Sequence, residues 1–193
     1  MTKRILVVLG QPDRKSYGGA LAAAYADGAR AAGAEVREIF LGEIRFNAAP
    51  LPGQLKPGEP EPDLAQSQQA ISWAEHLVFV YPIWWGTIPA LLKGFIERVF
   101  TPGFAVRYHE NSPRWDKLLE GRSARLIVTL NTPSFVYRWV FGRPGHVTMK
   151  RTILQFCGVR PVRITEVGPI KGSTDEQRAR WLGQARALGE RGG

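Results

Sequence analysis

Two adjacent tryptophans, Trp84 and Trp85, followed by Gly86, are the side chains in this sequence best suited to binding chemistry. They fall on a short turn between an apolar run, 76–81, and an amphipathic helical pattern that begins near Pro89. Two large rings on a loop expose more apolar surface than a folded chain normally leaves uncovered. The spacing therefore predicts a stacking site for a flat ligand. The alternative is that the rings are structural packing.

The residues on either side place this turn at the edge of a sheet. Residues 77–80 are apolar and rich in β-branched and aromatic types, and Pro82 ends the run because proline cannot donate to a strand ladder. Thr87 is the expected N-cap of the next helix, whose apolar residues recur three and four positions apart as far as Phe100. The turn then follows the carboxyl end of a strand, where open α/β sheets bind ligands.

Strand and helix patterns alternate along the whole chain. The expected strands cover residues 4–10, 35–41, 76–81, 122–131 and 160–167. The expected helices cover residues 17–32, 63–74, 89–100, 147–156 and 173–191. This alternation predicts an α/β fold of parallel strands with helices on both faces, as one domain over residues 1–193. The proline-rich stretch 50–62 is predicted to be a loop within that domain.

The loop between the first strand and the first helix is a second candidate site. A helix N-terminus there offers free N–H groups and the positive end of a helix dipole, which together favour a phosphate. The residues expected to contact it are Gln11, Arg14, Ser16, Tyr17 and Gly18. The chain has neither a P-loop motif nor a G-x-G-x-x-G motif, so ATP and Rossmann-type NAD binding lack their usual glycines.

The chain resembles the flavin-dependent NAD(P)H:quinone reductases of the DT-diaphorase type, which belong to the flavodoxin-like superfamily. The resemblance is carried by residues 82–100, followed by Gly103-Phe104-Ala105, and supported by residues 5–9, Pro12, Ser16, Leu21 and 156–158. It implies a flavodoxin-like, doubly wound sheet of five parallel strands in the order 2-1-3-4-5. It also implies a flavin cofactor, FMN or FAD, and NAD(P)H as co-substrate.

The resemblance further implies which residues hold the flavin. Its phosphate would lie on the first loop, and its ring system on the turn made by Pro82, Ile83, Trp84, Trp85 and Gly86. Its pyrimidine edge would meet Asn131, Thr132 and Ser134, after the fourth strand. The sequence departs from the family pattern twice: Gln11 replaces a histidine, and residues 131–134 replace a glycine-rich turn.

A tyrosine and a histidine help to accept charge during hydride transfer in the family. Tyr137 and His146 are the candidates for these catalytic roles here. The aromatic stretch that contains Tyr137 has an alternative role, which is to pack against a second subunit. Because its apolar residues 135–141 are unlike a free surface, we expect a homodimer.

The function predicted from the resemblance is flavin-dependent NAD(P)H oxidation with two-electron reduction of a quinone, the two substrates using one site in turn. The alternative is a non-catalytic flavodoxin-like electron carrier or a regulatory flavoprotein subunit. The net charge of +9 argues against a carrier, because carriers of that kind are acidic. The charge also suits a solvated surface, attraction of anionic dinucleotides, or nucleic acid, but no basic helix suited to a DNA groove stands out.

Cysteine and histidine usage sets the remaining expectations. The single cysteine, Cys157, cannot form an internal disulfide, and no secretory or membrane-spanning segment is recognised, which predicts a cytoplasmic protein with no integral membrane segment. His76 and His109 stand apart from other ligand-type residues, so no metal site is expected. We also expect no nucleic-acid partner.

Overall fold

A computed structural model describes residues 2–48, 60–110 and 112–192. Its centre is a parallel sheet in which neighbouring strands follow the order β2-β1-β3-β6-β7. The strands are β1 (Arg4–Leu9), β2 (Glu35–Phe40), β3 (His76–Pro82), β6 (Ser123–Thr129) and β7 (Val162–Val167). In chain order these are the five predicted strands, so the α/β class and the order 2-1-3-4-5 are confirmed.

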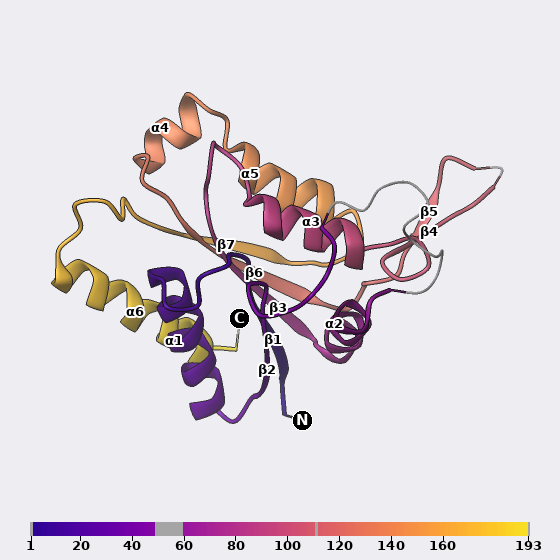
Figure 1. The fold of residues 1–193 in the computed structure, drawn as a ribbon, viewed down its shortest axis with the longest axis horizontal. Helices are drawn as coiled ribbons and strands as arrows, with labels where there is room; N and C mark the ends of the chain where they lie inside the picture. The colour runs from indigo at the N-terminus through magenta and orange to yellow at the C-terminus, as the bar shows by residue number, and fades with distance from the viewer. Residues whose placement is uncertain (1, 49–59, 111, 193) are drawn as a thin grey trace.

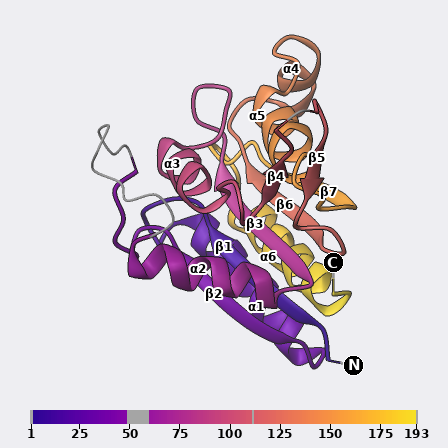
Figure 2. The ribbon, with the colours of Figure 1, turned by 90° about the vertical axis from the view of Figure 1, so that its right-hand side faces the viewer.

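Helices cover both faces of the sheet (Figures 1 and 2). On one face lie α1 (Tyr17–Ala31) and α6 (Asp175–Glu190), and on the other lie α2 (Pro62–Trp73), α3 (Ala90–Val99) and the π-helix η1 (Thr148–Leu154). Strand β1 shows how the sequence serves both layers, because Ile5 and Val7 pack on the α1/α6 side while Leu6 packs on the other. A strand buried on both faces is therefore continuously apolar.

Four short elements were not predicted. These are β4 (Val106–Tyr108) and β5 (Trp115–Lys117), which pair as an antiparallel hairpin, and the helices α4 (Ser134–Trp139) and α5 (Pro144–Val147). Each is too short to show a hydrophobic period. Residues 148–154 of the predicted helix 147–156 form the π-helix η1.

Two boundary predictions are corrected by the structure. Thr87 is not an N-cap: α3 begins at Ala90 with Pro89 at the cap position, and the backbone N–H and C=O of Thr87 instead bond those of Trp84. Most of the predicted proline-rich loop, residues 49–59, lies outside the described residues, whereas Pro62 is the first residue of α2.

None of the helices within the described ranges is both long and apolar enough to cross a membrane.

Candidate active site

Three loops meet at the carboxyl edge of the sheet, because they follow neighbouring parallel strands. The loop after β1 is tied to β3 by the Gly10 N–H, which donates to the Val80 carbonyl at 2.8 Å. The turn after β3 is tied to β6 by the Ile83 N–H, which donates to the Thr129 carbonyl at 2.7 Å. The sites predicted separately on these loops are thus brought side by side.

The turn that carries the tryptophans is a tight hairpin. Trp84 and Thr87 exchange two backbone hydrogen bonds of 3.0 Å, and the residues between them, Trp85 and Gly86, have φ of 49° and 78°. Positive φ at both central positions is the pattern of a type I′ turn, which favours Asn-Gly. A tryptophan at the first position is strained by about 1–2 kcal/mol. This turn displays the Trp85 ring, which is fully exposed (102%).

Beside this turn is an apolar hollow of about 480 Å³. Both tryptophan rings line it, together with residues at the start of α3 and one residue of η1; these are Thr87, Ile88, Pro89, Ala90, Lys93 and Thr148. Trp84 is half-exposed (48%), whereas Ile88 is buried. An apolar hollow walled by aromatic rings suits a planar ligand.

Tyr137, on α4, holds the turn from behind. Its side chain is buried, and its hydroxyl donates to the Gly86 carbonyl at 2.9 Å and accepts from the Gly145 N–H at 3.0 Å. Burial raises the pKa of Tyr137. A side chain added to Gly145 would meet the Tyr137 hydroxyl and Ile83 at 2.9 Å, so only glycine allows this close packing. The tyrosine hydroxyl therefore fixes the height of the tryptophan turn above α5.

His146, on α5, packs edge-on against the Tyr137 ring at 5.2 Å between centroids. Its side chain is buried, and its Nε2 lies 2.9 Å from Oε1 of Glu166, the residue before the end of β7. Arg143 Nε lies 3.6 Å from the same carboxylate oxygen. Burial lowers the pKa of His146, while the hydrogen bond and the charge of Glu166 oppose this and Arg143 adds to it. The two candidate catalytic side chains are thus neighbours, as predicted from their types.

The loop after β1 forms the N-terminus of α1. The Ser16 hydroxyl caps the helix by accepting from the Gly19 N–H at 3.2 Å, and the buried Gln11 amide donates to Ser16 Oγ and to the Asp13 carbonyl. Within the described ranges, the backbone N–H groups of Tyr17 and Gly18 have no protein partner. They are the donors that an anion at this helix end would receive.

Three of the predicted contact residues direct their polar groups elsewhere. Arg14 forms an exposed ion pair with Glu43 at 3.3 Å and lies over the Phe40 ring. The Tyr17 hydroxyl donates to the Arg178 carbonyl at 2.8 Å, and Asn131 Oδ1 accepts from the Lys171 N–H at 2.9 Å. Thr132 is half-buried and Ser134 is exposed, where it begins α4.

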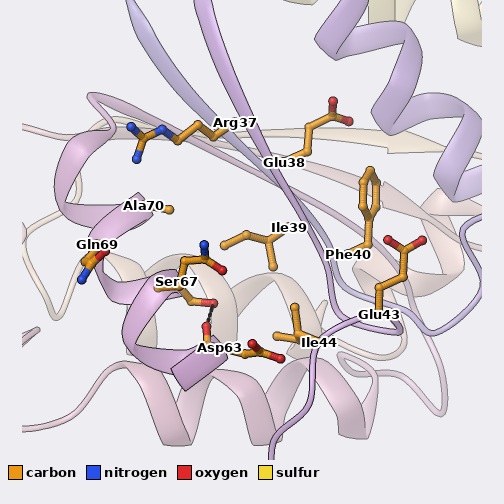
Figure 3. Close-up of a pocket in the computed structure, with 11 residues that line it drawn as sticks. Arg37, Glu38, Ile39, Phe40, Glu43, Ile44, Asp63, Ser67, Gln69 and Ala70 are labelled. Atoms are coloured by element: carbon orange, nitrogen blue, oxygen red, sulfur yellow. Dashed lines mark hydrogen bonds between the residues drawn. The ribbon is translucent and has the colours of Figure 1, made fainter. Parts of the chain in front are cut away.

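A larger cavity of about 600 Å³ lies between the edge strand β2 and α2 (Figure 3). Its lining mixes charges of both signs, from Arg37, Glu43 and Asp63, around Ile39. The Ser67 hydroxyl is already bonded to the Asp63 carbonyl at 2.7 Å. The cavity flanks the sheet and shares none of the three loops, so we place the candidate site at the smaller hollow, where exposed rings and free N–H donors converge.

A flavin fits the donors and surfaces at this edge. Trp85 offers a whole exposed ring, the start of α1 offers two free N–H groups, and His146 Nδ1 is buried without a hydrogen-bond partner in the described structure. Planar ring, phosphate and pyrimidine polar atoms thus each find a complementary group. By contrast, no cluster of three His, Cys, Asp or Glu residues placed to hold a metal is found in the described ranges.

The family is decided by a match of residues 3–188 to the model of the flavodoxin-like fold family. The chain belongs to that family. It is also similar to an uncharacterized NAD(P)H oxidoreductase of Haemophilus influenzae, at 27% identity over 180 residues, which covers 90% of this chain and 87% of that protein.

Two further proteins are similar over most of this flavodoxin-like chain. NAD(P)H dehydrogenase [quinone] 1 of Rattus norvegicus is 28% identical over 181 residues, which covers 81% of this chain but only 65% of the rat protein. The chain therefore spans less than two thirds of that relative. The structure of an NAD(P)H:quinone oxidoreductase from Methanothermobacter marburgensis is 24% identical with a TM-score of 0.83, covers 98% of each chain, and shares the fold.

Sequence reasoning did not select Glu166, Arg143, Gly145 or Thr148. Glu166 lies 20 positions after His146, on another element, so no local spacing connects them. One usable signal was present: Glu166 is the first acidic residue after Glu120, in a stretch otherwise rich in arginine. An isolated carboxylate at the carboxyl end of a predicted strand deserved consideration as a partner for a nearby histidine.

Proposed function

We propose that this protein is a flavin-dependent NAD(P)H oxidoreductase that reduces quinones by two electrons. The observation that carries this proposal is the exposed Trp85 ring, held on a strained turn at the same sheet edge as the free N–H groups of α1. The names of the Haemophilus and rat relatives support the activity, and the family match supports the site. When bound, the flavin supplies the hydride chemistry between the nicotinamide and the quinone.

The chain's own residues would bind and orient the reactants. The N–H groups of Tyr17 and Gly18 receive the flavin phosphate, with Ser16 and Gln11 holding the loop in place. Trp84 and Trp85 wall the apolar hollow and keep water from one face of the bound rings. NAD(P)H and then a quinone occupy this hollow in turn, since one hollow of about 480 Å³ does not hold both.

The polar residues behind the turn would respond to charge. Tyr137 keeps the turn at a fixed height through the Gly86 carbonyl, and His146 offers a ring that takes up a proton. Asn131, Thr132 and Ser134 lie on the neighbouring loop and would contact the polar edge of the flavin, with Asn131 through its amide nitrogen, because its oxygen is engaged. These roles complete the proposed site.

We also propose a cytoplasmic homodimer in which residues 135–141 of one subunit close the hollow of the other. Phe135, Trp139, Val140 and Phe141 are 57–75% exposed in the single chain. An apolar group of this size is typical of an interface. Residues 1–193 would form one flavin-binding domain.

Steady-state turnover distinguishes this proposal from a flavodoxin-like carrier or a regulatory subunit. The purified protein, loaded with FMN or with FAD, is given NADH or NADPH and a quinone, and loss of nicotinamide absorbance is recorded. We expect turnover with no second protein present. A protein that binds flavin but turns over only when a partner enzyme is added would be a carrier. The mass of the flavin released by heating separates FMN from FAD.

A further inference from the structure

Glu166 is placed to control the protonation of His146. The carboxylate lies at the end of β7, and its Oε1 is 2.9 Å from His146 Nε2. A carboxylate accepts hydrogen bonds and does not donate them, so the hydrogen between these atoms belongs to the histidine. The neutral His146 ring therefore carries its proton on Nε2.

That assignment leaves the other ring nitrogen bare. Nδ1 of His146 is buried and has no hydrogen-bond partner in the described structure. Since Nε2 is already protonated, a second proton can be added only at Nδ1. The imidazolium formed in this way would be balanced by the Glu166 charge at hydrogen-bond distance.

We propose that Glu166 is the positioning residue of this site: it holds His146 in the Nε2–H tautomer and makes Nδ1 the atom that takes up a proton when negative charge develops in the site. The assignment rests on the proposed function only for the origin of that negative charge. The proton itself comes from solvent, and the ring returns it when the charge is removed.

The other charged groups around His146 do not substitute for Glu166. Arg143 shares the Glu166 carboxylate at 3.6 Å, and Lys150 and Arg151, from η1, line the same small hollow of about 270 Å³ as His146. All three are cations, which disfavour an imidazolium. Tyr137 packs on the ring and its hydroxyl is committed to Gly86 and Gly145. Among these groups Glu166 alone favours the charged ring.

The test uses the whole protein without flavin, labelled with ¹⁵N-histidine. The chain has three histidines, so the ring signals of His146 can be assigned from a His146→Gln variant. We expect the Nε2–H tautomer in the wild type. In Glu166→Gln we expect the His146 pKa to fall by about one unit or more, because the group that opposes burial has lost its charge. Glu166→Asp keeps the charge and should restore part of the difference.

A matched control is available in His109, whose Nε2 lies 3.0 Å from Oδ1 of Asp116 on the exposed hairpin. Asp116→Asn should change the His109 signals and leave those of His146 unchanged. In flavin-loaded Glu166→Gln, kcat/KM should fall about tenfold or more, mainly through kcat, with its pH profile displaced toward lower pH.

The two proposals fail in different ways. An Nδ1–H tautomer in the wild type, or a His146 pKa that is the same in Glu166→Gln, overturns the assignment of Glu166 whatever the enzyme does. If the tautomer and the pKa behave as expected but the wild type binds no flavin, the assignment of Glu166 stands and the proposed function fails.

Discussion

Replacing Trp85 by asparagine should stabilise the flavin-free protein while weakening its binding of flavin. Asparagine tolerates the left-handed backbone that Trp85 adopts at φ 49°, and Asn-Gly is the favoured pair for a type I′ turn. The Trp85 ring is fully exposed, so its loss removes no packing. Relief of strain should raise the free energy of unfolding by about 1 kcal/mol, and the melting temperature by about 2–4 °C.

The expected loss of binding follows from the same exposure. A flavin that covers one face of the ring removes about 100 Å² of apolar surface, which at ~25 cal/mol per Å² corresponds to about 2.5 kcal/mol. The Kd for flavin should therefore rise about 50- to 100-fold. Flavin fluorescence titration measures this Kd, and thermal unfolding without flavin measures stability.

Trp115 is the matched control for this change. It is half-buried, stacked on Phe156 at 4.4 Å, and its Nε1 donates to the Phe156 carbonyl at 3.1 Å. Trp115→Asn should lower the melting temperature and leave the flavin Kd unchanged. The reasoning is refuted if Trp85→Asn melts as low as Trp115→Asn, or if it binds flavin as tightly as the wild type.

Four other perturbations have expected outcomes. Flavin at a hundred times its Kd should stabilise the protein by about 2.7 kcal/mol, seen as a rise of about 5–10 °C in melting temperature, and no rise with either FMN or FAD would contradict binding. Trp139→Asp should convert a dimer into a monomer in sedimentation experiments, and a wild type that is already monomeric and fully active would refute the interface. Tyr137→Phe should cost about 1–3 kcal/mol in urea unfolding, because buried polar groups of Gly86 and Gly145 lose a partner; an unchanged midpoint would show that the hydroxyl is not needed. Burial lowers the pKa of His76 from 6.5 to about 3, so the unfolded chain binds more protons between these values and the free energy of unfolding falls as the pH drops through them; His76→Gln should flatten this fall.

The sheet could be predicted from the sequence because its signal is local. Runs such as 77–80 are apolar without interruption, and strands of that type need helices on both faces. The stacking turn could also be predicted, since Trp84 and Trp85 stand between a strand and a helix signal. The structure adds that a strained backbone presents one of the two rings to solvent.

The polar side of the site could not be predicted in the same way. The contact of Tyr137 with Gly86 spans 51 positions, and that of His146 with Glu166 spans 20. Such contacts depend on how α4 and α5 pack across the ends of β3 and β7, and periodicity carries no information about that packing. The expected helix cap at Thr87 was wrong for a related reason, because a hairpin turn claims its backbone groups.

Anaerobic reduction of the flavin-loaded protein tests the central claim most directly. NADH or NADPH is added in one equivalent, the flavin absorbance near 450 nm is followed, and a quinone is then added. The proposed function predicts that the nicotinamide bleaches the flavin and that the quinone restores its colour, with no other protein present. A flavin that stays oxidised with both nicotinamides, or that stays bleached after the quinone is added, would contradict it.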